Sequence, residues 1–431
     1  MKVGIIDADL LDHGTRHPNL ALMKISGYLR DHDHEAKLLL EDDINSCLTY
    51  RDLLERYDKI VISKVFDFSR LPDIFVDAMA NTKIMRQGEC FGDYLYKTRG
   101  PKIVYGGTGF IPQLNGAMPN HLPGEIEHQQ LPDYHLYDEY VEKEIASGKK
   151  ANHYDDYRYY SIGFTTRGCF RRCKFCVNRE YQYVEPWSPI FEFYDSSRPY
   201  IYLWDDNFLG LKSHAKPFEG NQARPGIYLN TWSGILDDLE ATKKPFQFRQ
   251  GLDIRLMDEE IAERFTNCRY HGDYIFAFDH FNQKKLITKG LEIWKKYHPR
   301  GIPKFYVLCG FGDQTVKDIK ETFERIRILM TYGALPYIMR HSDYQKSKYA
   351  KLYVQMARWC NQPQFFKKKS FRQYCEACQE YHDKGTREKK VMYCSAYASL
   401  LEFERDYPEV AREYFDMRWD DLRDTWKVVP Q

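Results

Sequence analysis

Three cysteines lie close together as Cys169-x3-Cys173-x2-Cys176, and this spacing constrains the chain more than any other feature. Residues 160–164 before them predict a short buried strand, and residues 165–168 predict a turn. Three thiolates can bind three irons of a cubane cluster and leave the fourth iron open, which a site closed by four protein ligands cannot do. The alternatives are a zinc knuckle without its fourth ligand or three unrelated thiols, although zinc sites usually oppose one Cys-x2-Cys pair with a second pair.

Residues 166–176 read Thr-Arg-Gly-Cys-Phe-Arg-Arg-Cys-Lys-Phe-Cys and resemble the cluster loop of the radical SAM superfamily. The resemblance implies a 4Fe–4S cluster on Cys169, Cys173 and Cys176, with Phe175 beside the cofactor. In that superfamily the open iron binds S-adenosylmethionine, and an electron from the cluster cleaves it to methionine and a 5'-deoxyadenosyl radical. The resemblance therefore also implies an electron donor such as flavodoxin or ferredoxin, while the protein positions the cofactors.

The length of 431 residues predicts two or three domains. With 43% hydrophobic and 16% aromatic residues, the composition is typical of a globular chain and excludes disorder. A net charge of +1 provides no overall field for nucleic acid or a membrane. Residues 1–7 predict a strand rather than a signal peptide, no apolar run is long enough to span a membrane, and the cysteine spacings suggest no disulfide framework. We therefore expect a cytoplasmic protein without membrane partners.

Residues 1–112 alternate predicted strands and helices, which favours a doubly wound α/β domain. The expected elements are strands at 3–6, 37–40, 60–65 and 103–105 and a helix at 18–29. In front of a radical SAM core, such a domain resembles the cobalamin-binding domain of that architecture. Its cobalt-ligating motif Asp-x-His-x-x-Gly is missing, because residues 9–14 read Asp-Leu-Leu-Asp-His-Gly. We expect a degenerate domain without cobalamin, although His13, His17 and the turn at 106–107 keep that cofactor open.

The remaining chain is predicted to form a connector at 113–158, an α/β partial barrel at 159–344 and a helical C-terminal region at 345–431. Six strand–helix repeats match the incomplete (βα)6 barrel of the superfamily. The expected strands lie at 160–165, 200–205, 246–250, 274–279, 303–309 and 335–339. The expected helices lie at 176–182, 228–242, 258–267, 284–297 and 315–332. Ligand-binding residues should then follow the carboxyl ends of the strands.

Polar residues follow the second and third predicted strands. The resemblance places the methionine amino group near Asp205, Asp206 and Asn207, and a carboxylate suits an ammonium ion. The alternative is a turn with an Asx cap. Three polar residues at the third strand, Gln250, Asp253 and Arg255, are expected to point into the barrel. There they could meet the methionine carboxylate, the ribose or the substrate. The alternative is an internal ion pair.

The fourth and fifth predicted strands supply three more candidates. Asp279 is a candidate for the ribose hydroxyls, and His280 is a candidate acid–base group or a helix-start residue; we group both as catalytic. Gly310 ends an apolar strand and resembles the segment that contacts adenine in the superfamily, although glycine is also an ordinary turn residue.

The C-terminal region contains four further cysteines, Cys360, Cys375, Cys378 and Cys394. They are candidates for zinc or an auxiliary iron–sulfur cluster, or are buried free thiols. Lys367–Lys369 and residues 387–390 are basic and lie among aromatics, a pattern that fits either contact with RNA or a solvated charged face.

Together these features predict a radical SAM enzyme that abstracts hydrogen from a substrate the sequence does not name. One alternative chemistry is methyl or methylthio transfer to RNA or protein, which the domain order suggests. Another is rearrangement or maturation of a small molecule or peptide. A different class of protein, a non-enzymatic binding module stabilised by zinc, also stays open.

Overall fold

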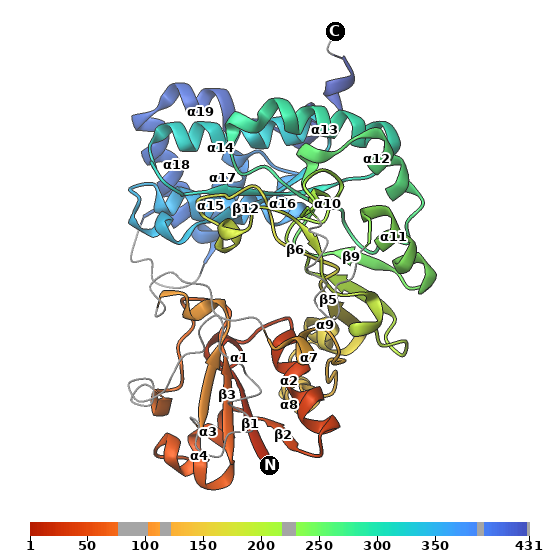
Figure 1. The fold of residues 1–431 in the computed structure, drawn as a ribbon. Helices are drawn as coiled ribbons and strands as arrows, with labels where there is room; N and C mark the ends of the chain where they lie inside the picture. The colour runs from red at the N-terminus through yellow and green to blue at the C-terminus, as the bar shows by residue number, and fades with distance from the viewer. Residues whose placement is uncertain (76–101, 113–121, 218–229, 386–391, 429–431) are drawn as a thin grey trace. The chain divides into compact units, whose positions relative to one another are not determined.

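The structure is a computed structural model that describes residues 1–75, 102–112, 122–217, 230–385 and 392–428 (Figure 1). The chain forms two compact units. Unit 1 consists of residues 1–166, 186–204 and 217–246, and unit 2 of residues 167–185, 205–216 and 247–431. These units interleave along the chain, so they do not decide the predicted domain ranges, which stay a prediction.

Unit 1 is built on a parallel sheet with the strand order β2-β1-β3-β4. Its strands are β1 (Lys2–Asp7), β2 (Glu35–Leu38), β3 (Lys59–Ser63) and β4 (Ile103–Gly106). Its helices are α1 (Ala8–His13), α2 (Leu20–Asp31), α3 (Glu41–Asn45), α4 (Tyr50–Arg56), α7 (Gly124–Glu127), α8 (Asp138–Ala146), α9 (Asp155–Tyr159) and α11 (Trp232–Ala241).

Both faces of this sheet are buried, because its central strands, β1 and β3, are nearly continuous apolar runs and successive side chains point to opposite faces. Val3 and Ile5 belong to one core with residues of α2, α7, α8 and α9, while Ile6 and Ile62 belong to a second core with residues of α3 and α4. Figure 1 shows α2, α7 and α8 on one side of the sheet and α3 and α4 on the other. A parallel sheet covered on both faces is the doubly wound arrangement predicted for residues 1–112.

The predicted connector contains more structure than its weak periodicity indicated. Residues 113–121 lie outside the described residues, but α7, α8 and α9 follow and pack into the first core. Tyrosines supply much of this packing: Tyr134 and Tyr137 are buried, and their hydroxyls bond Phe193 O at 2.6 Å and Asp7 Oδ2 at 2.8 Å. A tyrosine buries a large apolar ring while its hydroxyl reaches a partner, so a tyrosine-rich core escapes an apolar-periodicity search.

The six strands predicted after residue 159 all form. They make two three-stranded sheets, β5-β8-β9 and β10-β11-β12, in which the β5–β8, β10–β11 and β11–β12 pairs are parallel. One isolated parallel bridge joins Leu252 to Phe276 of β10. The strands are β5 (Tyr160–Gly163), β8 (Tyr200–Leu203), β9 (Phe246–Phe248), β10 (Ile275–Ala277), β11 (Lys304–Cys309) and β12 (Leu335–Arg340). Strands β5 and β8 belong to unit 1, and β10, β11 and β12 to unit 2.

The helices of unit 2 follow the predicted pattern with one exception. Helix α13 (Lys284–Tyr297) has the predicted bounds, and α12 (Glu259–Thr266) and α14 (Val316–Thr331) are each shorter than predicted by one residue at either end. The helix expected at 176–182 is instead a single 3₁₀ turn, Val177–Glu180, because Tyr181 is already extended at φ −72° and ψ 146°. The two short strands β6 (Thr166–Arg167) and β7 (Glu185–Pro186) pair at the ends of this segment.

The C-terminal region is helical, as predicted. Its helices are α15 (Ala350–Cys360), α16 (Pro363–Phe366), α17 (Phe371–Lys384), α18 (Ser395–Asp406), α19 (Pro408–Tyr414) and α20 (Trp419–Leu422). A short helix, α10 (Gly210–Ser213), precedes them. Phe323 of α14 packs with Phe371 and Phe415 at ring distances of 5.5 and 5.2 Å, which joins the helical region to the α/β part of unit 2. Among the described residues, none of the helices is both long and apolar enough to span a bilayer.

Asp7, at the carboxyl end of β1, gives unit 1 a predicted pH dependence. Burial raises the pKa of Asp7 to about 6, against hydrogen bonds from Tyr137 and Leu10. The folded state therefore holds this proton more tightly than the unfolded chain does. We expect the free energy of unfolding to fall by about 3 kcal/mol as pH rises through the window from about 4 to about 6.

Urea unfolding of the wild type and of Asp7→Asn across that window measures the effect. Asparagine carries no titrating proton, so the variant should show a flatter dependence of unfolding free energy on pH. Identical slopes for the two proteins would contradict the assignment.

Candidate functional site

The three cysteines lie in the loop between β6 and the 3₁₀ turn Val177–Glu180 of unit 2. All three thiols are free and half-buried. Gly168 and Arg172 have positive φ angles of 93° and 51°, which turn the chain sharply on either side of Cys169. Between the last two cysteines, the N–H of Cys176 donates to Cys173 O at 3.0 Å. The loop is therefore folded back on itself around the thiols.

The thiols lie close enough to influence one another's charge. Burial raises the pKa of Cys173 and of Cys176, and the neighbouring thiolates raise it further. Arg255 opposes this effect at Cys173, and the backbone N–H of Asn178 opposes it at Cys176. Since metal ions bind thiolates, an iron site here would have to displace protons from these sulfurs.

Two sulfurs accept hydrogen bonds, which suits thiolate ligands. Asn207 Nδ2 donates to Cys169 Sγ at 3.4 Å, and Asn178 N donates to Cys176 Sγ at 3.4 Å. Within the described residues, no group of three or more His, Cys, Asp or Glu side chains is arranged to hold a single metal ion. The thiolates of a cubane bind different irons, so they need not converge on one point.

Asp206 holds the cysteine loop at both ends. Its Oδ2 accepts from Gly168 N at 2.8 Å, just before Cys169, and its Oδ1 accepts from Asn178 Nδ2 at 2.6 Å, just after Cys176. Hydrogen bonds to a charged group are the stronger kind. The structure thus gives Asp206 a loop-holding contact on each oxygen, in addition to the predicted contact with an ammonium ion, which stays a prediction.

Asp253 lies at the centre of a buried ion cluster. Arg171 Nε donates to Asp253 Oδ2 at 2.7 Å, and Arg255 donates from Nε to Oδ1 at 2.5 Å and from NH2 to Oδ2 at 2.9 Å. Burial alone would raise the pKa of Asp253, but the two guanidinium groups outweigh it and hold the pKa below its usual value. This is the internal pairing weighed as the alternative for Asp253 and Arg255.

The third strand is shorter than predicted, which changes the argument for its polar residues. Strand β9 ends at Phe248, so Gln250, Asp253 and Arg255 lie beyond it and do not alternate along a strand as expected. Gln250 is exposed in a bend, and Asp253 caps the 3₁₀ turn Ile254–Leu256. The chain bends at Arg249 and Gln250, which ends the strand two residues early, and Gly251 follows with φ 93°.

Asp279 and His280 follow β10, as predicted. Burial raises the pKa of Asp279 even though Arg325 and Arg255 pull it down. Burial also lowers the pKa of His280, and the same two arginines lower it further. Both shifts favour the neutral form, which is the form of a candidate proton donor for Asp279 and of a proton acceptor for His280.

Aromatic rings gather at the ends of β10, β11 and β12. Phe175 of the cysteine loop lies 5.7 Å from both His280 and Phe311, measured between ring centroids, and Phe311 lies 4.8 Å from His341. Gly310 has φ 71°, and a Cβ there would meet Tyr344 Cβ at 2.6 Å, so close packing inside the chain already requires this glycine. Asp205 is buried at 2% exposure beside the site.

The structure adds residues that the sequence reasoning missed. Arg171 and Asn178 lie inside or just after the cysteine loop, and His341 follows β12. Arg325 is fully enclosed and donates from NH1 to the carbonyl oxygens of Phe278, Asp279 and Leu308 at 3.0, 2.7 and 2.9 Å. An arginine on the apolar stripe of a predicted helix was the signal that could have revealed Arg325.

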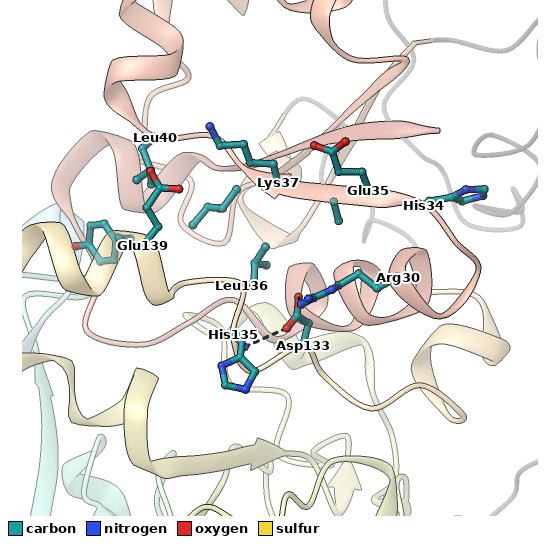
Figure 2. A pocket seen from close by; sticks show the side chains of 12 residues that line it. Arg30, His34, Glu35, Lys37, Leu40, Asp133, His135, Leu136 and Glu139 are labelled. Carbon is teal, nitrogen blue, oxygen red and sulfur yellow. Dashed lines mark hydrogen bonds and ion pairs between the residues drawn. The ribbon is translucent and has the colours of Figure 1, made fainter.

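Two cavities in the described residues lie away from these side chains. One, of about 330 Å³, runs along β2 and is lined by Arg30, Lys37 and Asp133 among others (Figure 2). Its charges already pair, Arg30 with Asp133 at 2.9 Å and Lys37 with Asp43 at 2.8 Å. The other, of about 390 Å³, lies at the amino ends of β10 and β11. Neither is lined by a predicted site residue.

The C-terminal cysteines divide into two groups. Cys360 is buried and influenced by Cys309, whereas Cys375 is influenced by Cys378 and Cys394. Burial raises the pKa of both Cys360 and Cys375. All four thiols are free, and the described residues here form no group arranged for one metal ion. Whether they bind a metal or a cluster stays open.

Comparisons with known proteins place the chain far from characterised ones. No family model matches it, and no curated protein matches it. Among solved structures, it is similar to the radical S-adenosylmethionine methyltransferase TsrM from Kitasatospora setae with tryptophan and a SAM analog bound, with 12% identity, a TM-score of 0.43 and coverage of 78% of this chain and 72% of that chain. The same enzyme with cobalamin and a [4Fe-4S] cluster gives 12% identity and a TM-score of 0.40, covering 79% and 74%. At this identity and TM-score, the similarity supports no conclusion about function.

The two contacts of Asp206 predict that Asp206→Ala loosens the cysteine loop. Each lost hydrogen bond should remove about 2 kcal/mol of the free energy that stabilises the ordered loop. After anaerobic reconstitution, we expect iron to be lost to a chelator at least about tenfold faster than in the wild type. Asn178→Ala removes only one of the two bonds and should give an intermediate rate. Full iron retention together with weaker binding of S-adenosylmethionine would instead assign Asp206 to the ammonium.

Proposed function

We propose that this chain is a radical SAM enzyme. In this proposal Cys169, Cys173 and Cys176 bind a 4Fe–4S cluster, S-adenosylmethionine binds beside it, and hydrogen is abstracted from a substrate. When bound, these cofactors supply the electron and the radical. The chain's own residues hold the cysteine loop, set the charge around it and cover the site with apolar and aromatic side chains.

The observation that carries the proposal is the state of the three thiols. They occupy one tight loop that Asp206 holds at both ends, and two of them accept N–H bonds. Unrelated surface cysteines would need neither feature. The guanidinium of Arg255 near Cys173 adds positive charge, which favours thiolates.

The arrangement of strands supports the further proposal of a partial (βα)6 barrel. The strand orders β5-β8-β9 and β10-β11-β12 are sequential, and the β5–β8, β10–β11 and β11–β12 pairs are parallel. An isolated parallel bridge joins Leu252, which follows β9, to Phe276 of β10. In such a barrel, ligands bind at the carboxyl ends of the strands. Asp206, Asn207, Asp253, Asp279 and Gly310 all follow strand ends, and we propose that S-adenosylmethionine and the substrate bind among them.

The central test is Cys173→Ala. We expect loss of the bound iron and of S-adenosylmethionine cleavage, because two thiolates do not hold the cubane. Iron and sulfide analysis and detection of 5'-deoxyadenosine measure the two effects. The matched control is Cys268→Ala, which removes another half-buried cysteine of unit 2 outside the loop and should keep both properties.

The same preparation separates the enzyme from the zinc-binding alternative. An iron–sulfide absorbance band near roughly 400 nm after anaerobic reconstitution supports the cluster. Zinc by elemental analysis, with no iron uptake, supports a non-enzymatic binding module. A Cys173→Ala variant that keeps about three to four irons per chain and full cleavage would refute the assignment.

We also propose that the N-terminal sheet binds no cobalamin. His17 Nδ1 already pairs with Asp156, and His13 lies 3.3 Å from Ser69 Oγ and packs against Phe66 and Phe68. At the turn after β4, a Cβ at Gly107 would meet Lys64 O at 2.3 Å, so the backbone of Lys64 already lies against this glycine.

Equilibrium dialysis with hydroxocobalamin measures this prediction, and we expect no stoichiometric binding. Binding that disappears in His13→Ala or His17→Ala would overturn the prediction and favour methyl transfer as the reaction.

A further inference from the structure

Asn207 supplies one of the two hydrogen bonds that the sulfurs of the cysteine loop accept. Its Nδ2 donates to Cys169 Sγ at 3.4 Å and lies 3.5 Å from Asp253 Oδ2, and the residue is only 4% exposed. The amide orientation follows from these partners. Both are acceptors, so the reversed amide would direct its oxygen at a sulfur and a carboxylate.

The position of this side chain is fixed by its neighbours. Phe208 beside it is fully buried, and Gly210 N donates to Asn207 O at 3.0 Å. Because only 4% of Asn207 is exposed, its side chain is enclosed by neighbouring atoms, which restricts its rotation.

The carboxylate of Asp253, which lies beside Asn207, is paired with two arginines. Asp253 would oppose a negative cluster, but Arg171 and Arg255 neutralise its carboxylate. The amide N–H is then a partial positive charge held against one thiolate in a half-buried loop, where water screens it weakly.

We infer that Asn207 sets the reduction potential of the cluster through its hydrogen bond to Cys169, an inference that rests on the proposed function. Reduction adds one electron, and part of its charge falls on the ligand sulfurs. A donor aimed at a sulfur stabilises the reduced form, and hydrogen bonds to sulfur are among the factors that set cluster potentials. Asn207 is thus a positioning and tuning residue rather than a contact of S-adenosylmethionine alone.

The test is a potentiometric titration of reconstituted protein with dithionite, monitored by electron paramagnetic resonance without S-adenosylmethionine. Asn207→Leu has a similar size and no donor. Its reduction equilibrium should shift about tenfold toward the oxidised form, a potential lower by about 59 mV for one electron. Asn207→Asp replaces the donor with a negative charge and should lower the potential further.

Asn178→Ala is the matched control. It loosens the same loop through Asp206, yet the backbone N–H of residue 178 still donates to Cys176, so the potential should stay at the wild-type value. An equal shift in Asn178→Ala would assign the effect to loop disorder and overturn the inference, as would an unchanged potential in Asn207→Leu. If Asn207→Leu does not retain iron, Asn207→Asp gives the same comparison. Failure of the wild type to take up iron would instead refute the proposed function itself.

Discussion

The candidate site depends on two carboxylates that each accept several hydrogen bonds. Asp206 accepts from a backbone N–H and an amide N–H, and Asp253 accepts from two guanidinium groups, which hold its pKa below the usual value. Burial by itself raises the pKa of a carboxyl group, and the pKa of Asp279 stays raised even with Arg325 and Arg255 nearby. The geometry of the cysteine loop is therefore tied to the electrostatics of the segments that follow β8 and β9.

This coupling explains why the loop can be short and still ordered. The loop is rich in basic residues, Arg171, Arg172 and Lys174, and Phe175 is its aromatic contact with the ends of β10 and β11. Its conformation is fixed instead by charge-assisted hydrogen bonds that reach from Gly168 to Asn178 through one side chain, Asp206. Ordering by a few strong contacts makes the loop sensitive to single substitutions that would be mild in an apolar core.

The sequence was sufficient to predict the six strands, the helix Lys284–Tyr297 and the doubly wound sheet, because each rests on local periodicity. It was not sufficient to predict the partners of Asp253 or Asp206, since Arg171 and Gly168 are remote in sequence and nothing in a single chain reveals such pairs. The predicted end of the third strand was wrong because the chain already bends at Arg249 and Gln250, after β9 has ended at Phe248. The structure of the tyrosine-rich connector was not predicted, because buried tyrosine rings with bonded hydroxyls produce no apolar periodicity in the sequence.

In each unit, one buried arginine donates hydrogen bonds to three backbone carbonyl groups. Carbonyl groups at the ends of parallel strands have no partner in the next strand, and leaving them buried without hydrogen bonds is costly. In unit 1, Arg198 donates to the carbonyls of Tyr134, Tyr157 and Tyr160, where β5 begins. In unit 2, Arg325 donates to three carbonyls at the ends of β10 and β11. The rigid fork of a guanidinium reaches several oxygens at once, and lysine, with a single point of charge, would leave some of them unbonded. In unit 2 the same positive charge lies near Asp279 and His280. There it opposes the rise that burial causes in the pKa of Asp279 and adds to the fall that burial causes in the pKa of His280.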